Sequence, residues 1–484
     1  MNTGPGSAVY TIAVTALLAS LFVALPGRST AYARVGLPPV TKPLTRPIDR
    51  SLERVDRLGS RTRREVKEAE ETIDEAAQEV VEDTGETAAS AADDAAQTAE
   101  AVAGTAIDAA GSAAGSTTQA AAGAVANLLR PFVVSADPSG WPIEENVVVT
   151  LVDETELATL MQSGVDVLSH RELHGLGLTL VAMRDANASR TVDELRRAHP
   201  DLTVDFNHVY RFASDGSTAS PVEEVTTGDG DAGPGGAPLR VGMIDSAVLR
   251  DHMSLRDSRV ISEDFAAHEG SRPLGHGTAV ASLIARSAAN EAEIHAASVF
   301  FQAPGFAPGA TTESLIAALD WLVSQEVQVI NMSLAGPANE LLEAALIAVG
   351  EARCVVVAAV GNNGPSGEPL YPAAYEGVIG VTAVDREQKI FRYANRGDHV
   401  DYAALGVDVK VADSGGSWRL ESGTSMASPH IAAVVARMRQ SHDLTMDSLM
   451  NVLTENAEDL GKKGFDRVFG HGLITEPPLL ASRD

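Results

Sequence analysis

Short apolar runs in the second half of the chain limit its fold more than any other feature. Residues 239–245 read LRVGMID, and similar strand-length runs follow at IHAASVFF and CVVVAAV. Runs that are apolar on both faces and rich in β-branched residues are typical of buried parallel strands. Segments 312–324 and 340–351 predict helices that cover the sheet. We therefore expect an α/β domain with a doubly wound, mostly parallel sheet.

A small module precedes this region at residues 145–213. Its pattern predicts strands at 146–152, 165–168, 178–183 and 202–212, and helices at 154–163 and 189–199. The resulting β-α-β-β-α-β order is that of a small α+β, ferredoxin-like sandwich. Residues 214–238 are rich in Gly, Ser, Pro and acidic residues, a composition that predicts a flexible, protease-accessible linker.

The start of the chain predicts targeting and tethering segments. An apolar run at residues 8–25 leads to Ala31-Tyr32-Ala33, which predicts a secretory signal peptide over residues 1–33. The alternative is an uncleaved membrane anchor, because a run of this length can just span a bilayer. In either case we expect a secreted protein, or one of the periplasm or cell envelope. Residues 34–130 form a low-complexity Ala/acidic tail with too little large apolar surface to fold alone.

Charge and cysteine content narrow the function. The chain has 37 Lys and Arg against 66 Asp and Glu, a formal charge of −29. No basic patch stands out, so this balance argues against nucleic-acid binding. The one cysteine, Cys354, excludes an intrachain disulfide and a thiolate metal cage. It opens an apolar strand, and we expect it to be a small buried hydrophobe.

Three stretches carry an acid, an imidazole and a hydroxyl. Asp245 ends a predicted buried strand, at the edge where open α/β sheets place their sites. His276 lies between two glycines where a helix is expected to begin. Ser425 lies in Gly423–Pro429, where an apolar helix is expected to begin, with Pro429 in its first turn. The unpaired N–H groups at a helix start favour an anion. Each stretch alone also fits an ordinary turn residue or helix cap.

In the order Asp, His, Ser, these stretches resemble the subtilisin-like serine proteases (subtilases). The likeness runs along residues 239–478, through segments 245–255, 329–337, 355–364, 371–374 and 423–429. It implies a subtilisin-like fold and a serine endopeptidase that hydrolyses peptide bonds. It assigns Asp245, His276 and Ser425 to a catalytic triad and Asn362 to the oxyanion hole. On its own, Asn362 in Gly-Asn-Asn-Gly also fits a turn residue.

The resemblance also implies how substrate binds. An extended polypeptide would add as a strand along the segment 333–336, with a side-chain pocket between it and segment 359–361. The implied binding residues are Ser333, Leu334, Ala335, Gly336, Ala359, Val360 and Gly361. Ala335 stands where the family usually has Gly, so its methyl is expected to narrow the groove. The resemblance requires no cofactor and assigns no metal ligand. In the family, a loop after the helix that begins at His276 often binds structural calcium, and that loop is missing here. We therefore expect at most weak calcium binding by surface carboxylates.

The module at 145–213 resembles a subtilase propeptide. Asn207–Tyr210 is similar to the end of such a segment, which lies in the active-site cleft. We expect the module to assist folding, inhibit the enzyme and be released by a cut after Tyr210 or within 211–239. The expected partners are polypeptide substrates and this propeptide, with a membrane only through an uncleaved N-terminal segment. A second class stays open: a fold that cuts only itself and then acts as a cell-envelope interaction protein.

Overall fold

The computed structural model describes residues 132–475, with gaps at 163–164, 186, 199–201, 214–219, 223–237, 267, 269–271, 273, 289–291 and 303–306. These residues belong to one unit, which runs from Phe132 to Asp484. The predicted signal peptide (1–33) and tail (34–130) lie outside the described residues, as does most of the predicted linker.

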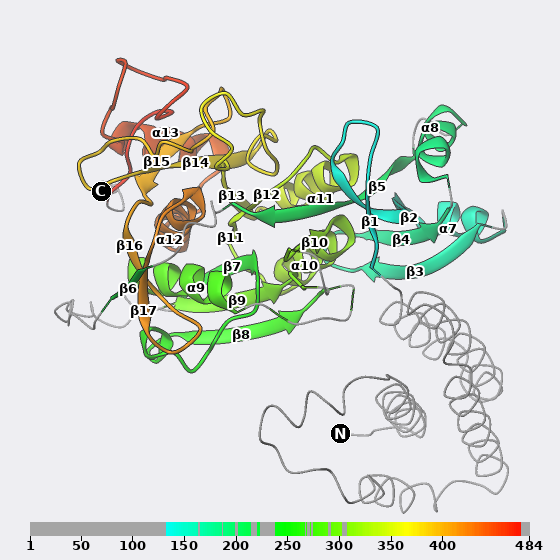
Figure 1. Ribbon diagram of the computed structural model, residues 1–484, viewed down its shortest axis with the longest axis horizontal. Helices are drawn as coiled ribbons and strands as arrows, with labels where there is room; N and C mark the ends of the chain where they lie inside the picture. The colour runs from blue at the N-terminus through cyan, green and yellow to red at the C-terminus, as the bar shows by residue number, and fades with distance from the viewer. Residues whose placement is uncertain are drawn as a thin grey trace, which may run out of the picture. The chain divides into compact units, whose positions relative to one another are not determined.

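A parallel sheet of seven strands forms the centre of the unit (Figure 1). Its order across the sheet is β15 (Tyr402–Leu405), β14 (Val378–Val384), β13 (Val355–Ala359), β11 (Val329–Met332), β7 (Leu239–Asp245), β9 (Ala292–Ser298) and β8 (Arg259–Asp264). β7 is the first of these strands in the sequence and lies inside the sheet. The later strands lie on both sides of it. The predicted doubly wound parallel sheet is confirmed.

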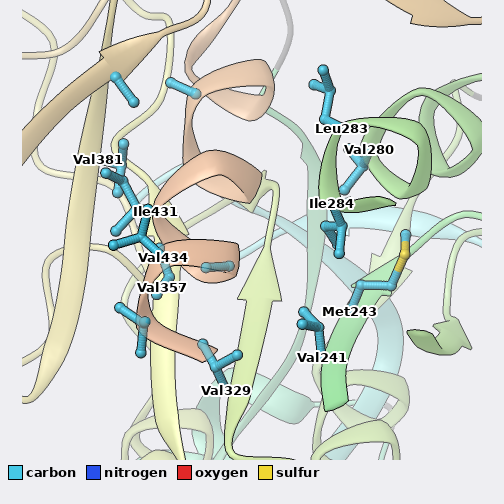
Figure 2. Close-up of a cluster of buried hydrophobic side chains, with 14 of the residues drawn as sticks. Val241, Met243, Val280, Leu283, Ile284, Val329, Val357, Val381, Ile431 and Val434 are labelled. Carbon is cyan, nitrogen blue, oxygen red and sulfur yellow. The ribbon is translucent and has the colours of Figure 1, made fainter. Parts of the chain in front are cut away.

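Helices cover both faces of this sheet. They are α9 (Gly275–Ser287), α10 (Thr312–Ser324), α11 (Glu340–Glu351), α12 (Thr424–Ser441) and α13 (Met446–Asn456). Successive strand side chains point to opposite faces. Val241 and Met243 therefore pack against α9 and α12 (Figure 2), whereas Ile244 packs in the cluster formed with α10 and α11. Each such buried side chain stabilises the fold by about 1.5–3 kcal/mol relative to exposure.

The module is an antiparallel sheet with two helices. Its elements are β2 (Pro142–Val152), α7 (Glu154–Gln162), β3 (Asp166–Leu173), β4 (Leu178–Arg184), α8 (Ala188–Ala198) and β5 (Thr203–Phe212). The strands lie in the order β5-β2-β4-β3. The predicted strand 165–168 is longer in the structure. A further strand, β1 (Val134–Ala136), pairs with β2 and was not predicted.

The end of β5 leaves the module and enters the larger region (Figure 1). There it pairs with two short strands, β10 (Ala310–Thr311) and β12 (Leu334–Ala335). A separate antiparallel sheet holds β16 (Val409–Ala412), β17 (Trp418–Glu421) and β6 (Ser220–Val222). β17 ends just before α12. The small sheet and the end of β5 therefore both lie near the candidate site.

Candidate active site

The carboxylate of Asp245 lies at the carboxyl end of β7, inside the parallel sheet. It is fully buried, and its two oxygens lie 2.8 and 3.0 Å from Nδ1 of His276. The amide of Ser246 donates a further hydrogen bond of 2.7 Å to Asp245 Oδ1. A buried carboxylate needs such partners because water cannot solvate it. The structure thus joins the first two residues of the predicted triad.

The glycine after His276 lets α9 approach the end of β7. A Cβ at position 277 would lie 2.2 Å from the carbonyl oxygen of Ser246, closer than side-chain atoms can come. The amide of Gly277 instead donates to Ser246 Oγ at 2.7 Å. Gly275 has no such requirement, because the nearest atom to its Cβ position lies 3.6 Å away, on Arg419. Only one of the two glycines is therefore needed for close packing.

The electrostatic surroundings of His276 suit a general base. Burial lowers the pKa of its imidazole, but the charge of Asp245 and the hydrogen bond to it raise the pKa by more. The pKa of His276 therefore lies above its ordinary value. The other nitrogen, Nε2, is buried and has no hydrogen-bond partner among the described residues. That atom is available to accept a proton.

Ser425 is the second residue of α12 and is fully buried. Pro429 is the sixth residue of this helix, not a first-turn residue as expected. Proline has no N–H, so the carbonyl of Ser425 lacks its usual helical donor. The hydroxyl of Ser333 replaces that donor at 2.9 Å. The helix start that carries Ser425 is thereby tied to the segment that leads into β12.

The carbonyl oxygen of Ala213 lies between two predicted site residues. It accepts hydrogen bonds of 2.5 Å from Ser425 Oγ and 2.5 Å from Asn362 Nδ2. The amide of Ala213 donates to the carbonyl of Ser333 at 3.3 Å. Asn362 is itself held by Thr424, whose amide donates to its Oδ1 at 3.2 Å. A backbone carbonyl of this chain thus occupies the site where a serine and an amide donor converge.

A catalytic triad has a hydrogen bond between its serine and its histidine, and here the bond between Ser425 and His276 is not formed. The serine hydroxyl has one proton, and it is directed to the carbonyl oxygens of Ala213 and Ser333. His276 Nε2 accordingly stays without a partner among the described residues. The structure pairs Asp245 with His276 and brings Ser425 and Asn362 to the carbonyl of Ala213, whose neighbour Phe212 stacks on His276.

The predicted strand-binding segment does hold an extended chain. In β12, Leu334 pairs with Phe212 and Ala335 pairs with Arg211 of β5. Gly336 exchanges two backbone hydrogen bonds with Tyr371 on its other side. Not all of the predicted binding residues direct their side chains into the groove. Leu334 and Val360 are buried in the core under the sheet. Leu334 therefore contributes to the groove through its backbone, which pairs with Phe212.

Aromatic side chains of β5 fill the groove. The ring of Phe212 stacks on that of His276, with centroids 4.4 Å apart, and on Phe300 at 4.0 Å. Tyr210 is fully buried and donates to the carbonyl of Pro337 at 3.0 Å. A Cβ at Gly336 would lie 2.4 Å from the Tyr210 ring, so the absent side chain there makes room for the tyrosine.

The sequence did not point to β10 or to Phe300. Ala310 and Thr311 of β10 pair with Tyr210 and Val209. A two-residue strand carries no periodicity, and it is defined only by the partner it binds. Phe300, in the run IHAASVFF, was classed with the buried strand, and nothing local separated it from a core residue.

The remaining predictions concern Cys354, metals and membrane segments. Cys354 is buried, as expected, and burial raises the pKa of its thiol to about 12, so it stays protonated. Within the described residues, no group of three or more His, Cys, Asp or Glu side chains is arranged to hold a metal ion. Among the helices that the structure describes, none combines the length and apolarity needed to cross a bilayer.

The doubly wound parallel sheet carries an acid–imidazole pair at the end of β7 and a serine at the start of α12, an arrangement typical of the subtilisin-like α/β fold. A family model described as "Subtilase family" matches residues 193–472, and the chain belongs to this family.

Curated relatives agree with this assignment. The chain is 28% identical to the minor extracellular protease Epr of Bacillus subtilis (strain 168) over 360 residues, which cover 68% of this chain and 54% of that protein. It is 30% identical to subtilisin DY of Bacillus licheniformis over 255 residues, covering 49% and 89%. It is 32% identical to subtilisin E of Bacillus subtilis (strain 168) over 257 residues, covering 49% and 65%. The match thus spans about half the length of Epr.

Two solved structures are also similar. One is a lanthipeptide protease, with a TM-score of 0.44 and 22% identity over 49% of this chain and 85% of that one. The other is the prenylagaramide maturation protease PagA, with a TM-score of 0.43 and 24% identity over 50% and 92%.

Proposed function

We propose that the chain is a secreted serine endopeptidase that cuts extended polypeptides and is made as a self-inhibited precursor. The carbonyl of Ala213 carries the proposal. It accepts from Ser425 Oγ and Asn362 Nδ2 while its own strand is paired with β12. A peptide about to be cut needs the same placement, with the carbonyl beside the nucleophile and its oxygen beside donors.

The proposed reaction starts at Ser425. Its Oγ attacks the carbonyl carbon and its proton passes to Nε2 of His276, the buried nitrogen that has no other partner. Asp245 holds the imidazole through Nδ1 and stabilises the imidazolium. Asn362 Nδ2 and the N–H groups at the start of α12 stabilise the oxyanion. The amine then leaves with the proton from His276, and water repeats the sequence on the acyl-enzyme.

The module at 145–213 acts as the inhibitor in this proposal. Its last strand fills the groove that substrate needs, with Tyr210 fully buried there. It also supports the fold. Asn207 Oδ1 accepts from the amide of Glu313 at the start of α10, and Asp205 Oδ2 accepts from the amide of Glu340 at the start of α11. Helix N-termini need such acceptors, so β5 stabilises two helices of the larger region.

The proposed maturation cut lies between Ala213 and Ser214. It falls inside the interval 211–239 expected from the sequence. Beyond it, Ser220–Val222 pairs with β17, and β17 ends four residues before Ser425. The chain is therefore held on both sides of the proposed cut.

The proposed destination is outside the cytoplasm. The segment 1–33 resembles a secretory signal, and Epr, a relative, is named an extracellular protease. The tail at 34–130 would then link the enzyme to its surroundings or act as a solvated spacer.

The test uses the full chain and its Ser425→Ala variant. We expect the parent to be trimmed after Ala213, as read by mass spectrometry, and then to digest denatured casein with turnover. The Ser425→Ala protein should stay intact in pure form and digest nothing. Trimming of that variant at the parent's rate would exclude self-cleavage, and casein digestion by it would exclude Ser425 as the nucleophile.

The tight fit of Tyr210 also favours a second function, in which the fold cuts itself once and the segment stays bound. The protein would then act as a cell-envelope interaction protein. A single cut after Ala213 without any casein turnover would support this alternative.

A further inference from the structure

The methyl group of Ala213 is enclosed by a small apolar cluster. Ala213 is 3% exposed and packs with Ala335, Ala359 and Leu370, all buried. Trp141, which directly precedes β2, packs against the same cluster. Because the carbonyl of Ala213 lies at the proposed nucleophile, this cluster is the pocket for the side chain that precedes the cut bond.

Leu370 fills the part of this pocket next to the backbone of segment 359–361. A Cβ built on Gly361 would lie 2.5 Å from Leu370 Cδ1, so the leucine side chain lies directly against that glycine. Backbone hydrogen bonds hold the chain at Leu370 and at the residue after it. Tyr371, the next residue, exchanges two backbone hydrogen bonds with Gly336, and the carbonyl of Leu370 accepts from Ala374 at 3.1 Å.

Ala335 forms the opposite wall. Ala335 lies on β12 and pairs in register with Arg211 of β5, so moving its backbone would break this strand pairing. It is 8% exposed and belongs to the same cluster as Ala213. Ala335 and Leu370 pack around the methyl group of Ala213, and enlarging a side chain in a packed site forces off-rotamer or backbone shifts.

We propose that Ala335 and Leu370 are specificity-determining residues that restrict the side chain before the cut bond to the size of alanine. The inference rests on the proposed endopeptidase function. The substrate class is then extended polypeptide with Ala, Gly or Ser at this position. Trp141 lies before the proposed cut and leaves with the module, whereas Ala335 and Leu370 stay with the enzyme, so the restriction persists after maturation.

The test uses enzyme matured from the full chain and peptides of sequence Tyr-Arg-Phe-X with a reporter after X. We expect kcat/KM for X = Ala to exceed that for X = Phe by at least about tenfold. In Leu370→Ala we expect this ratio to fall by about tenfold, and in Ala335→Gly to fall less, because a smaller volume is freed. The control Leu346→Ala removes a buried leucine of α11 outside the cluster and should leave the ratio unchanged.

The ratio compares two substrates on one preparation, so a loss of folded protein in a variant cannot imitate a change in specificity. A ratio near one in the parent, or one that Leu370→Ala does not move, would overturn the inference while casein digestion that depends on Ser425 keeps the proposed function intact. If neither casein nor any peptide is cut, both fall together.

In the precursor, Ala213→Phe places the same mismatch in cis. We expect self-cleavage to slow by at least about tenfold, and the double variant Ala213→Phe with Leu370→Ala to recover part of that rate. Equal trimming of the parent and Ala213→Phe would contradict the assignment.

Discussion

At the scale of residues, the site depends on how the charges of Asp245 and His276 are stabilised. Asp245 has no access to water and is satisfied by His276 and the amide of Ser246. His276 in turn carries a raised pKa because of that carboxylate, with smaller effects from Glu421, which raises it, and Arg419, which lowers it. The acid therefore sets the pH at which the base works.

This sets the pH dependence of activity. The imidazole must be neutral to accept the proton of Ser425, so activity rises with pH through the pKa of His276. Since that pKa is raised, kcat/KM of the matured enzyme should rise through a midpoint above about 6.5. Release of the module reduces the burial that lowers this pKa, so the direction stays the same. A midpoint below the ordinary histidine value would contradict this account.

Glu421→Gln should move the same midpoint to lower pH, because it removes a negative charge that raises the pKa of His276. It leaves Arg419, which lowers that pKa, without this partner. The pH profile of kcat/KM measures the shift. Asp443→Asn, which removes an exposed carboxylate paired with Arg353, is the matched control and should leave the midpoint in place.

Asn362→Ala should lower kcat by about 10²–10³ with a small change in KM, a magnitude known from subtilisin itself rather than from this geometry. Its Nδ2 donates to the carbonyl of Ala213, where negative charge develops in the proposed reaction. Its Oδ1 also accepts from Thr424, so thermal unfolding should be measured alongside. A KM effect with an unchanged kcat would show that Asn362 only binds substrate.

At the scale of elements, β5 connects the two parts of the molecule. It belongs to the module's sheet through β2 and to the site through β10 and β12. One strand thereby presents Ala213 to Ser425 and caps two helices. Whatever displaces the end of β5 opens the site.

Gly336→Ala tests this dependence. The new methyl would lie 2.4 Å from the ring of Tyr210, so we expect the module to bind the groove more weakly and self-cleavage to slow. Gly350→Ala is the control, because nothing lies within 4 Å of its Cβ position in α11 and alanine favours the helix by about 0.5–1 kcal/mol. Trimming rates and inhibition by added module measure both. Unchanged trimming in Gly336→Ala would show that Tyr210 need not occupy its pocket.

The sequence predicted long elements better than short ones. The strand 239–245 and the helices 312–324 and 340–351 have the bounds expected, because apolar runs and periodic faces are local signals. β10 and β12 are two residues long, and only the partner strand β5 makes them strands. The likeness to subtilases supplied the expected roles of Asp245, His276 and Ser425. It did not reveal that Ala213 would hold the serine hydroxyl away from His276, since that depends on where β5 ends.

At the scale of the whole molecule, stability should also depend on a partly buried acid outside the site, Asp401. Asp401 lies between β14 and β15, and its Oδ2 accepts from the amide of Gly380 at 2.7 Å. Burial raises the pKa of its carboxyl to about 6, against the hydrogen bond from Gly380 that lowers it. The folded state therefore holds a proton that the unfolded state has released between pH 4 and 6.

Because the pKa is raised in the folded state, the contribution of Asp401 to stability is largest below about pH 4 and is lost as pH rises through about 6. Asp401→Asn keeps an acceptor for Gly380 and cannot ionise. We expect the free energy of unfolding of the parent, relative to this variant, to fall on the order of 2 kcal/mol between pH 4 and 7. Denaturant titrations across this range measure it. A constant difference would show that Asp401 ionises as it does in water.

The account depends most on Ser425 as the nucleophile. Matured enzyme treated with a serine-directed phosphonate should gain one adduct per chain, mapped by peptide mass spectrometry to the peptide that contains Ser425. Casein digestion should be lost in proportion to the labelling. An adduct on another serine, or digestion that persists with Ser425 fully modified, would contradict the account.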